Sequence, residues 1–281
     1  MTTIVTAVMV GVAVLFAGSL PWGFMLAPLN LRVGVSVPWA ALPMAAYLWG
    51  YWTFIRGDWG SPEHAATRRH DLRANALSGD LWPVALVAGL VGFGALFALI
   101  TVMARLVPLP QSAQIPTPAG MPAVTMLVLL TMASVVAGVT EEAAFRGYMQ
   151  TPIEERYGLP LAILVNGTMF GLLHFPNHPD SVLVMLPYYI AVAAVYGGLT
   201  WAANSILPSL VLHVGGDIWS LGRLWMTGRP EWQLSSSPPA LIRETGVDGG
   251  FLVAIASLAM LTGLTVAGYR AVRRLRLAAQ A

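Results

Sequence analysis

The chain has 281 residues, of which 57% are hydrophobic and only 10% are charged. Soluble domains typically carry about 25% charged residues, so this composition excludes an ordinary soluble protein and predicts a polytopic membrane protein. All 15 basic residues are arginine and the net charge of +2 is too small to indicate a nucleic-acid-binding surface. The lack of cysteine in the sequence excludes disulfides, a thiolate nucleophile and a cysteine-based zinc site.

Eight apolar stretches approach or reach the roughly twenty residues that a helix needs to cross a bilayer. The first lacks a basic leading region and a clear cleavage site, which indicates a retained helix rather than a signal peptide. We therefore predict an all-α fold with about eight transmembrane helices. The predicted spans are Thr3–Met25, Val37–Ile55, Leu81–Ala104, Met121–Thr140, Leu159–Phe175, Val182–Ala203, Ile206–Trp225 and Gly250–Tyr269.

Polar segments between these spans predict the orientation of the chain. Arg56–Asp80 is the one sizeable polar loop, and the tail after Tyr269 carries four arginines. With Arg146 set aside, nine arginines fall on the side of both termini and five on the other side. The positive-inside tendency then places both termini in the cytoplasm. Arg229–Gly250, on the outer side, is expected to be a flexible loop because serine and proline run together in it.

Thr140–Met149 is the stretch that carries the strongest functional signal. It places Glu141 and Glu142 directly after twenty residues without any charge, and ionisable groups at bilayer depth usually mark function. If the helix continues, Glu142 and Arg146 share a face at i and i+4 and can pair, while Glu141 points about 100° away. The alternative is a charged helix edge that anchors at the lipid headgroups.

A turn near Tyr157 and Gly158 would fold the fourth and fifth spans into a hairpin. Glu141 and His174 are each about sixteen residues from that turn, or roughly 25 Å along their helices, so they should meet at one depth. The seventh span adds His213 and Asp217, which share a helix face at i and i+4. Taken alone, each histidine could equally be structural.

Three motifs occur in order on these helices: Glu-Glu-x-x-x-Arg from Glu141 to Arg146, Phe-x-x-x-His from Phe170 to His174, and His-x-x-x-Asp from His213 to Asp217. Together they resemble the CPBP intramembrane proteases, also called the Abi or type II CAAX prenyl endopeptidase family. The resemblance covers about Met121 to Trp225. It implies a catalytic core of spans four to seven in residues 111–228, between N-terminal helices with a cytoplasmic loop (1–110) and an outer loop, last helix and basic tail (229–281).

The resemblance also implies roles for these residues in an endopeptidase that cleaves a membrane-associated protein or peptide. Glu141 and His174 would activate water, and His213 would donate to the developing oxyanion. Glu142, Arg146 and Phe170 would support the site. Many relatives carry asparagine where this chain has Asp217, so Asp217 would instead orient His213 or bind a metal.

Two questions stay open at this stage. The preferred mechanism needs no cofactor, but Glu141, His174 and His213 also form an acceptable ligand set for zinc or another divalent metal. There are two alternative functions. One is a catalytically silent binding or immunity scaffold of the same fold, and the other is a proton-coupled transporter. Expected partners are the lipid bilayer, most simply a bacterial plasma membrane, and the substrate, with no nucleic acid. His64, His70 and His178 are assigned no chemistry.

The predicted orientation can be tested with cysteines introduced at Ser61 and Ala279. Because the chain has no native cysteine, a membrane-impermeant thiol reagent should label neither position in intact cells and both after lysis. Labelling of both positions from outside would reverse the orientation.

Overall fold

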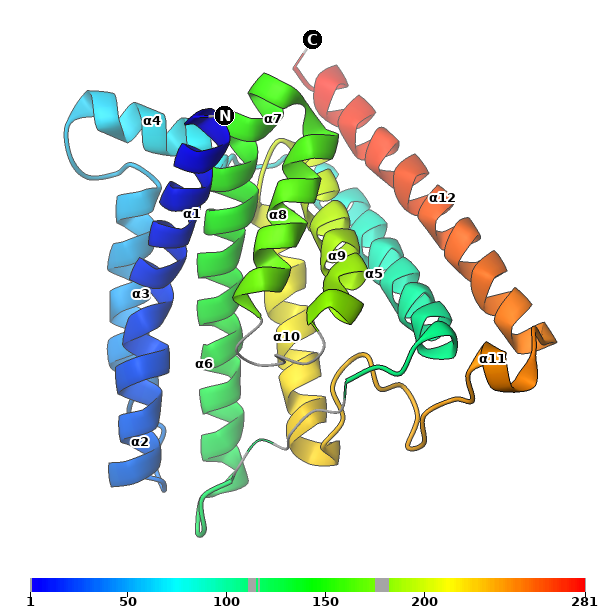
Figure 1. Ribbon diagram of the computed structural model, residues 1–281. Helices are drawn as coiled ribbons and strands as arrows, with labels where there is room; N and C mark the ends of the chain where they lie inside the picture. The colour runs from blue at the N-terminus through cyan, green and yellow to red at the C-terminus, as the bar shows by residue number, and fades with distance from the viewer. Residues whose placement is uncertain (1, 111–114, 116, 175–181, 281) are drawn as a thin grey trace.

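The computed structural model describes residues 2–110, 115, 117–174 and 182–280. In this part of the chain all regular structure is helical, which confirms the predicted all-α class (Figure 1). Phe175, the predicted end of the fifth span, and His178 lie outside the described residues. The helices are α1 (Thr2–Leu20), η1 (Pro21–Leu26), α2 (Ala27–Val33), α3 (Ala41–Ile55), α4 (Pro62–Leu72), α5 (Leu81–Leu106), α6 (Ala123–Glu141), η2 (Glu142–Met149), α7 (Gln150–Tyr157), α8 (Leu159–Leu173), α9 (Val182–Ala203), α10 (Leu207–Thr227), α11 (Ile242–Thr245) and α12 (Gly249–Ala278).

Each of the eight predicted apolar segments coincides with a helix of the structure. Among the described residues, five helical runs are long and apolar enough to cross a membrane: Thr3–Val33, Leu81–Leu106, Ala123–Tyr157, Leu183–Ala203 and Gly249–Ala278. The apolar helix α8 is shorter. Large apolar side chains such as Met9 on α1 and Met260 on α12 are exposed on the outside of the bundle, as expected for groups that face lipid.

The predicted hairpin turn is confirmed at Gly158, the single residue between α7 and α8. Its φ of +86° lies in a region that glycine adopts at little cost. Pro160 follows in the first turn of α8, where a missing backbone N–H does no harm. The chain therefore reverses sharply here and brings α8 back along α7 and η2.

Glycines allow the helices around the hairpin to approach closely. A methyl group built at Gly167 of α8 would lie 2.5 Å from the Cα atom of Ile190 on α9. At Gly138 of α6 it would lie 2.5 Å from a methyl group of Val214 on α10. Small residues at such crossings are typical of helix packing in membranes. They fix how α6, α8, α9 and α10 surround the site.

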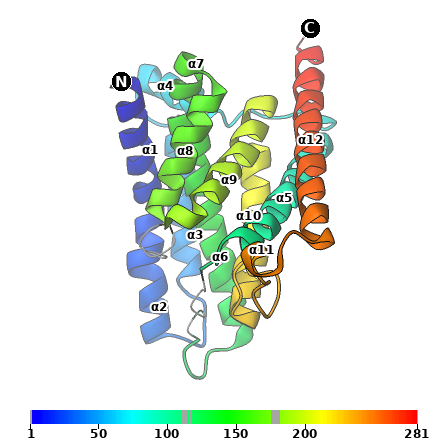
Figure 2. The ribbon, with the colours of Figure 1, turned by 45° about the vertical axis from the view of Figure 1, so that its right-hand side comes forward.

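The two termini, α4 and α7 lie at one end of the bundle in both views (Figures 1 and 2). This end also holds the segment 56–80, which is not simply a loop, since it contains α4 and packs on the hairpin. The Thr151 hydroxyl donates to the Asp71 carbonyl at 2.8 Å, and Arg73 pairs with Glu154 at 3.0 Å. The segment therefore closes this end of the helix that carries Glu141. Its assignment to the cytoplasm stays a prediction.

The tip of the hairpin is covered at its base. Gln150 is fully buried, and its amide donates to the Gly197 carbonyl at 3.0 Å and to Glu154 at 2.9 Å. The buried amide is satisfied within the protein, so α7 packs against α9 rather than standing alone.

Candidate active site

The two adjacent glutamates end α6 and begin η2, a π-helical stretch. All eight residues of η2 are buried, with Glu142 fully covered and Arg146 only 1% exposed. Glu142 and Arg146 are therefore buried within the protein, and the alternative of a charged helix edge at the lipid headgroups is wrong for them. π-Helical turns have i to i+5 bonds and occur frequently at functional sites.

The predicted pair of Glu142 and Arg146 is confirmed, with Arg146 Nη1 3.2 Å from Glu142 Oε1. The same oxygen lies 2.7 Å from Nδ1 of His213 on α10. An ionised carboxylate can only accept hydrogen bonds, so Nδ1–H of His213 is the donor. Glu142 thus links η2 to α10. Because Nδ1 of His213 faces Glu142, the other ring nitrogen, Nε2, faces away from it.

The guanidinium of Arg146 is surrounded by aromatic rings. Its central carbon lies 4.9 Å from the ring centre of Tyr196, 5.4 Å from that of Phe170 and 5.8 Å from that of Phe145. Within the described residues its nitrogens donate no hydrogen bond of good geometry, so the charge of Arg146 depends on Glu142 and on these rings. Desolvated cation–π contacts can contribute about 2 kcal/mol or more each, so the rings support the charge of Arg146 together with the Glu142 carboxylate.

The second nitrogen of His213, Nε2, faces two further carboxylates. It lies 3.6 Å from Glu141 Oε2 and 3.6 Å from Asp217 Oδ2. The ring of Tyr196 stacks on the imidazole at 5.0 Å between centres. His213 is therefore held by Glu142 on one side and presents its other nitrogen to Glu141 and Asp217.

His174 follows the last residue of α8 and is held by its own helix. Its Nδ1–H donates to the Phe170 carbonyl at 2.8 Å, because a carbonyl oxygen can only accept. The centre of its ring lies 4.5 Å from the ring centre of Phe170 and 5.1 Å from that of Tyr189. In the described structure His174 makes no hydrogen bond or ion pair with Glu141. The two side chains, which were expected to meet, line the same cavity without direct contact.

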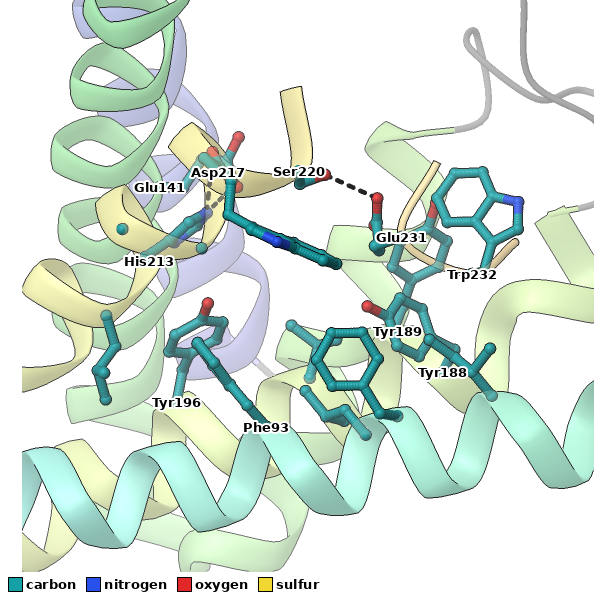
Figure 3. A pocket seen from close by; sticks show the side chains of 18 of the residues that line it. Phe93, Glu141, Tyr188, Tyr189, Tyr196, His213, Asp217, Ser220, Glu231 and Trp232 are labelled. Carbon is teal, nitrogen blue, oxygen red and sulfur yellow. Dashed lines mark hydrogen bonds and ion pairs between the residues drawn. The ribbon is translucent and has the colours of Figure 1, made fainter. Parts of the chain in front are cut away.

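That cavity, of about 460 Å³, brings the four predicted residues together and is within the size range of small-molecule sites. Glu141, His174, His213 and Asp217 all line it. Figure 3 shows Glu141, His213 and Asp217 grouped at one part of its wall. The rest of the lining is largely apolar and aromatic, with side chains from α5, α9 and α10.

From His213 the cavity follows α10 toward its C-terminal end, which lies away from the chain termini (Figures 1 and 3). Glu231 and Trp232, just after α10, form part of the wall, whereas no described residue of 56–80 does. The lining of the cavity therefore extends toward the end of the bundle opposite the termini.

Three features of the site were missed by sequence reasoning. Glu142 and His213 are 71 positions apart, and no local spacing indicates that they bond. Phe93 and Phe97 of α5 line the cavity although they lie outside the predicted core region. Glu231 stands in a segment expected to be a flexible loop. Only its charge within an apolar chain could have drawn attention to it.

The metal alternative requires that ligand side chains converge. Glu141, His174 and His213 share the cavity, but no group of three or more histidine or acidic residues in the described part of the chain is arranged to hold a metal ion. His213 already uses Nδ1 toward Glu142. The side-chain arrangement thus does not fit a preformed three-ligand site.

These observations define a class: an all-helical membrane protein with a carboxylate- and histidine-lined cavity among its helices. Residues 123–219 match the family described as type II CAAX prenyl endopeptidase Rce1-like, which supports the resemblance that the three motifs indicated. The matched segment runs from the start of α6 into α10 and contains Glu141, His174, His213 and Asp217. No curated protein and no solved structure matches the chain.

The buried pair yields a stability prediction. Arg146→Ala leaves the Glu142 carboxylate buried without its cation, and breaking a buried pair in this way typically costs about 3–5 kcal/mol. We expect a clearly lower thermal unfolding midpoint in detergent. Arg156→Ala, at an exposed position on α7, is the matched control and should unfold near the wild-type temperature.

The double variant Arg146→Ala/Glu142→Gln removes the uncompensated charge as well. Its unfolding midpoint should therefore lie above that of Arg146→Ala, since residues in one ion pair are not additive. A wild-type midpoint for Arg146→Ala combined with lost activity would contradict the structural role and assign the arginine to substrate contact.

Proposed function

We propose that the protein is an intramembrane endopeptidase that hydrolyses a peptide bond in a membrane-associated protein or peptide. The observation that carries this proposal is the convergence of Glu141, His174, His213 and Asp217 in one cavity. All four come from the segment that matches a peptidase family. Family membership alone would not assign an activity, because function depends on the site rather than the fold.

Glu141 is the residue best placed to act as the general base. Its side chain is 19% exposed, whereas that of Glu142 is fully covered and occupied by Arg146 and His213. Glu141 would take a proton from water as the water oxygen attacks the carbonyl carbon of the substrate. It would then return the proton to the leaving nitrogen as the C–N bond breaks, which yields a carboxylic acid and an amine.

The two histidines have complementary positions in this scheme. His174 holds its Nδ1–H to the Phe170 carbonyl, so the neutral ring leaves Nε2 free to accept a hydrogen bond from the attacking water. His213 is held at Nδ1 by Glu142, and with a proton on Nε2 it would donate to the oxyanion. Because Glu142 already compensates Arg146, the Asp217 carboxylate, 3.6 Å from Nε2, would balance the charge of that doubly protonated ring.

Asp217 is assigned a positioning role. An ionised aspartate cannot donate to an oxyanion, unlike the asparagine that the resemblance associates with this position. Asp217 lies one turn beyond His213 on the same face of α10, and its carboxylate is 3.6 Å from His213 Nε2. It would therefore orient His213 and help to keep the second proton on its ring.

The activity is tested by comparing the protein termini in membranes of cells that express wild-type protein or Glu141→Gln. Loss of a general base typically lowers the rate by about 10²- to 10⁴-fold, so Glu141→Gln and His174→Ala should each remove termini that the wild type generates. Both variants should elute from size exclusion as wild type does. Glu63→Gln, an exposed carboxylate on α4, should leave cleavage unchanged.

The same termini in wild type and Glu141→Gln would instead support a non-catalytic scaffold. Full activity of either purified variant would remove the residue concerned from the mechanism.

Metal dependence is a separate measurement on detergent-purified protein. On the proposed mechanism, activity persists after treatment with a strong chelator and dialysis. One equivalent of zinc that is lost together with activity, and whose return restores it, would replace this mechanism with one in which His174 and His213 are ligands.

A further inference from the structure

One carboxylate of the cavity is not used by the proposed chemistry. Glu231 lies on the segment that follows α10, outside residues 123–219 that match the family. In Figure 3 it stands apart from the group of Glu141, His213 and Asp217, beside Tyr188, Tyr189 and Trp232. Its position in the wall calls for a physical reason, because an isolated charge in an apolar cavity is costly.

Glu231 is held in a defined place. The Ser220 hydroxyl on α10 donates to Glu231 Oε2 at 2.8 Å. Arg223, one turn further along α10, donates to the backbone carbonyls on both sides of Glu231, those of Pro230 and Gln233. The segment is therefore fastened to the end of α10, and its carboxylate is built into the wall.

The surroundings of Glu231 are suited to a positive charge. Among the described residues that line the cavity there is no arginine, while Glu141, Asp217 and Glu231 are all acidic. Arg223 is directed at backbone carbonyls and makes no ion pair with Glu231 in the described structure. Aromatic rings next to a carboxylate attract organic cations, through the ring faces and through the charge.

We propose that Glu231 determines substrate specificity by binding a cationic group of the substrate, either a lysine or arginine side chain or an amino terminus. This inference rests on the proposed endopeptidase function and adds the substrate class. Glu231 recognises charge at one end of the cavity, and Glu141 with the histidines cleaves at the other.

α10 gives the spacing, because it carries His213 at one end of the cavity and Ser220, which holds Glu231, at the other. His213, Asp217 and Ser220 follow one face of α10 at i, i+4 and i+7, and seven residues of α-helix span about 10 Å. An extended peptide covers about 3.3–3.6 Å per residue. The cationic group should therefore lie about three residues from the bond that is cleaved.

The test uses detergent-purified protein and an equimolar mixture of peptides whose cleavage is followed by mass spectrometry. Wild type should prefer lysine or arginine about three positions from the cleaved bond. Glu231→Gln should lower the ratio of kcat/KM for a lysine peptide over its glutamine counterpart by about tenfold or more, as expected for loss of a charge-assisted contact. Glu231→Lys should reverse the preference toward aspartate and glutamate.

The matched control is Glu244→Gln, which removes the same charge from the same outer segment at a residue that does not line the cavity. It should keep the wild-type preference. Peptides with an acetylated amino terminus distinguish the two sources of charge: a preference that persists assigns a side chain, and one that disappears assigns the amino terminus. Wild-type cleavage without any preference for a cation would overturn the inference and leave the proposed function intact.

A binding measurement tests the cation site without catalysis. Benzamidinium and its neutral counterpart benzamide are added to Glu141→Gln protein, and thermal unfolding is recorded. Benzamidinium should raise the unfolding midpoint and benzamide should not. In the double variant Glu141→Gln/Glu231→Gln, benzamidinium should no longer raise it. Equal effects of the two compounds, or a shift that survives in the double variant, would overturn the inference.

Discussion

The buried contact of Arg146, Glu142 and His213 is the constraint on which the site depends. Glu142 accepts from His213 at 2.7 Å and lies 3.2 Å from Arg146, with both Glu142 and Arg146 almost completely covered. Such charges lose several kcal/mol of hydration each, so they persist only if the surrounding helices keep their relative positions. Phe170 of α8 and Tyr196 of α9 contact the same guanidinium. One ion pair therefore aligns η2, α8, α9 and α10.

Two neighbouring glutamates acquire different roles through this alignment. Consecutive residues of a helix point in different directions, so Glu142 faces the buried arginine while Glu141 reaches the cavity. The exposure of their side chains, 0% and 19%, reflects this division. η2 begins at Glu142, whose carboxylate contacts His213 of α10. Glu142 is thus fixed and charge-compensated beside the more accessible carboxylate of Glu141. Preorganised acid–base chemistry requires such an arrangement.

Local patterns in the sequence predicted a large part of this structure. Apolar length located the helices, Gly158 located the hairpin, and the i, i+4 spacing of Glu142 and Arg146 predicted their pair, because each depends on neighbours along the chain. The bond from Glu142 to His213 could not be predicted in this way. It depends on how α6 and α10 pack, which the close approach at Gly138 decides. The packing of 56–80 on the hairpin is likewise a tertiary contact.

The position of Glu231 extends this reasoning from the reaction to the choice of substrate. α10 supplies His213 and Asp217 at one part of the cavity, and Ser220, which holds Glu231, at another. Glu231 follows α10, but Ser220 and Arg223 hold its segment against this helix. Because the rise of an α-helix is nearly constant, α10 sets the distance between His213 and the proposed recognition group. On this assignment, the cleaved bond is selected by its distance from a positive charge, and the sequence around it need carry little other information.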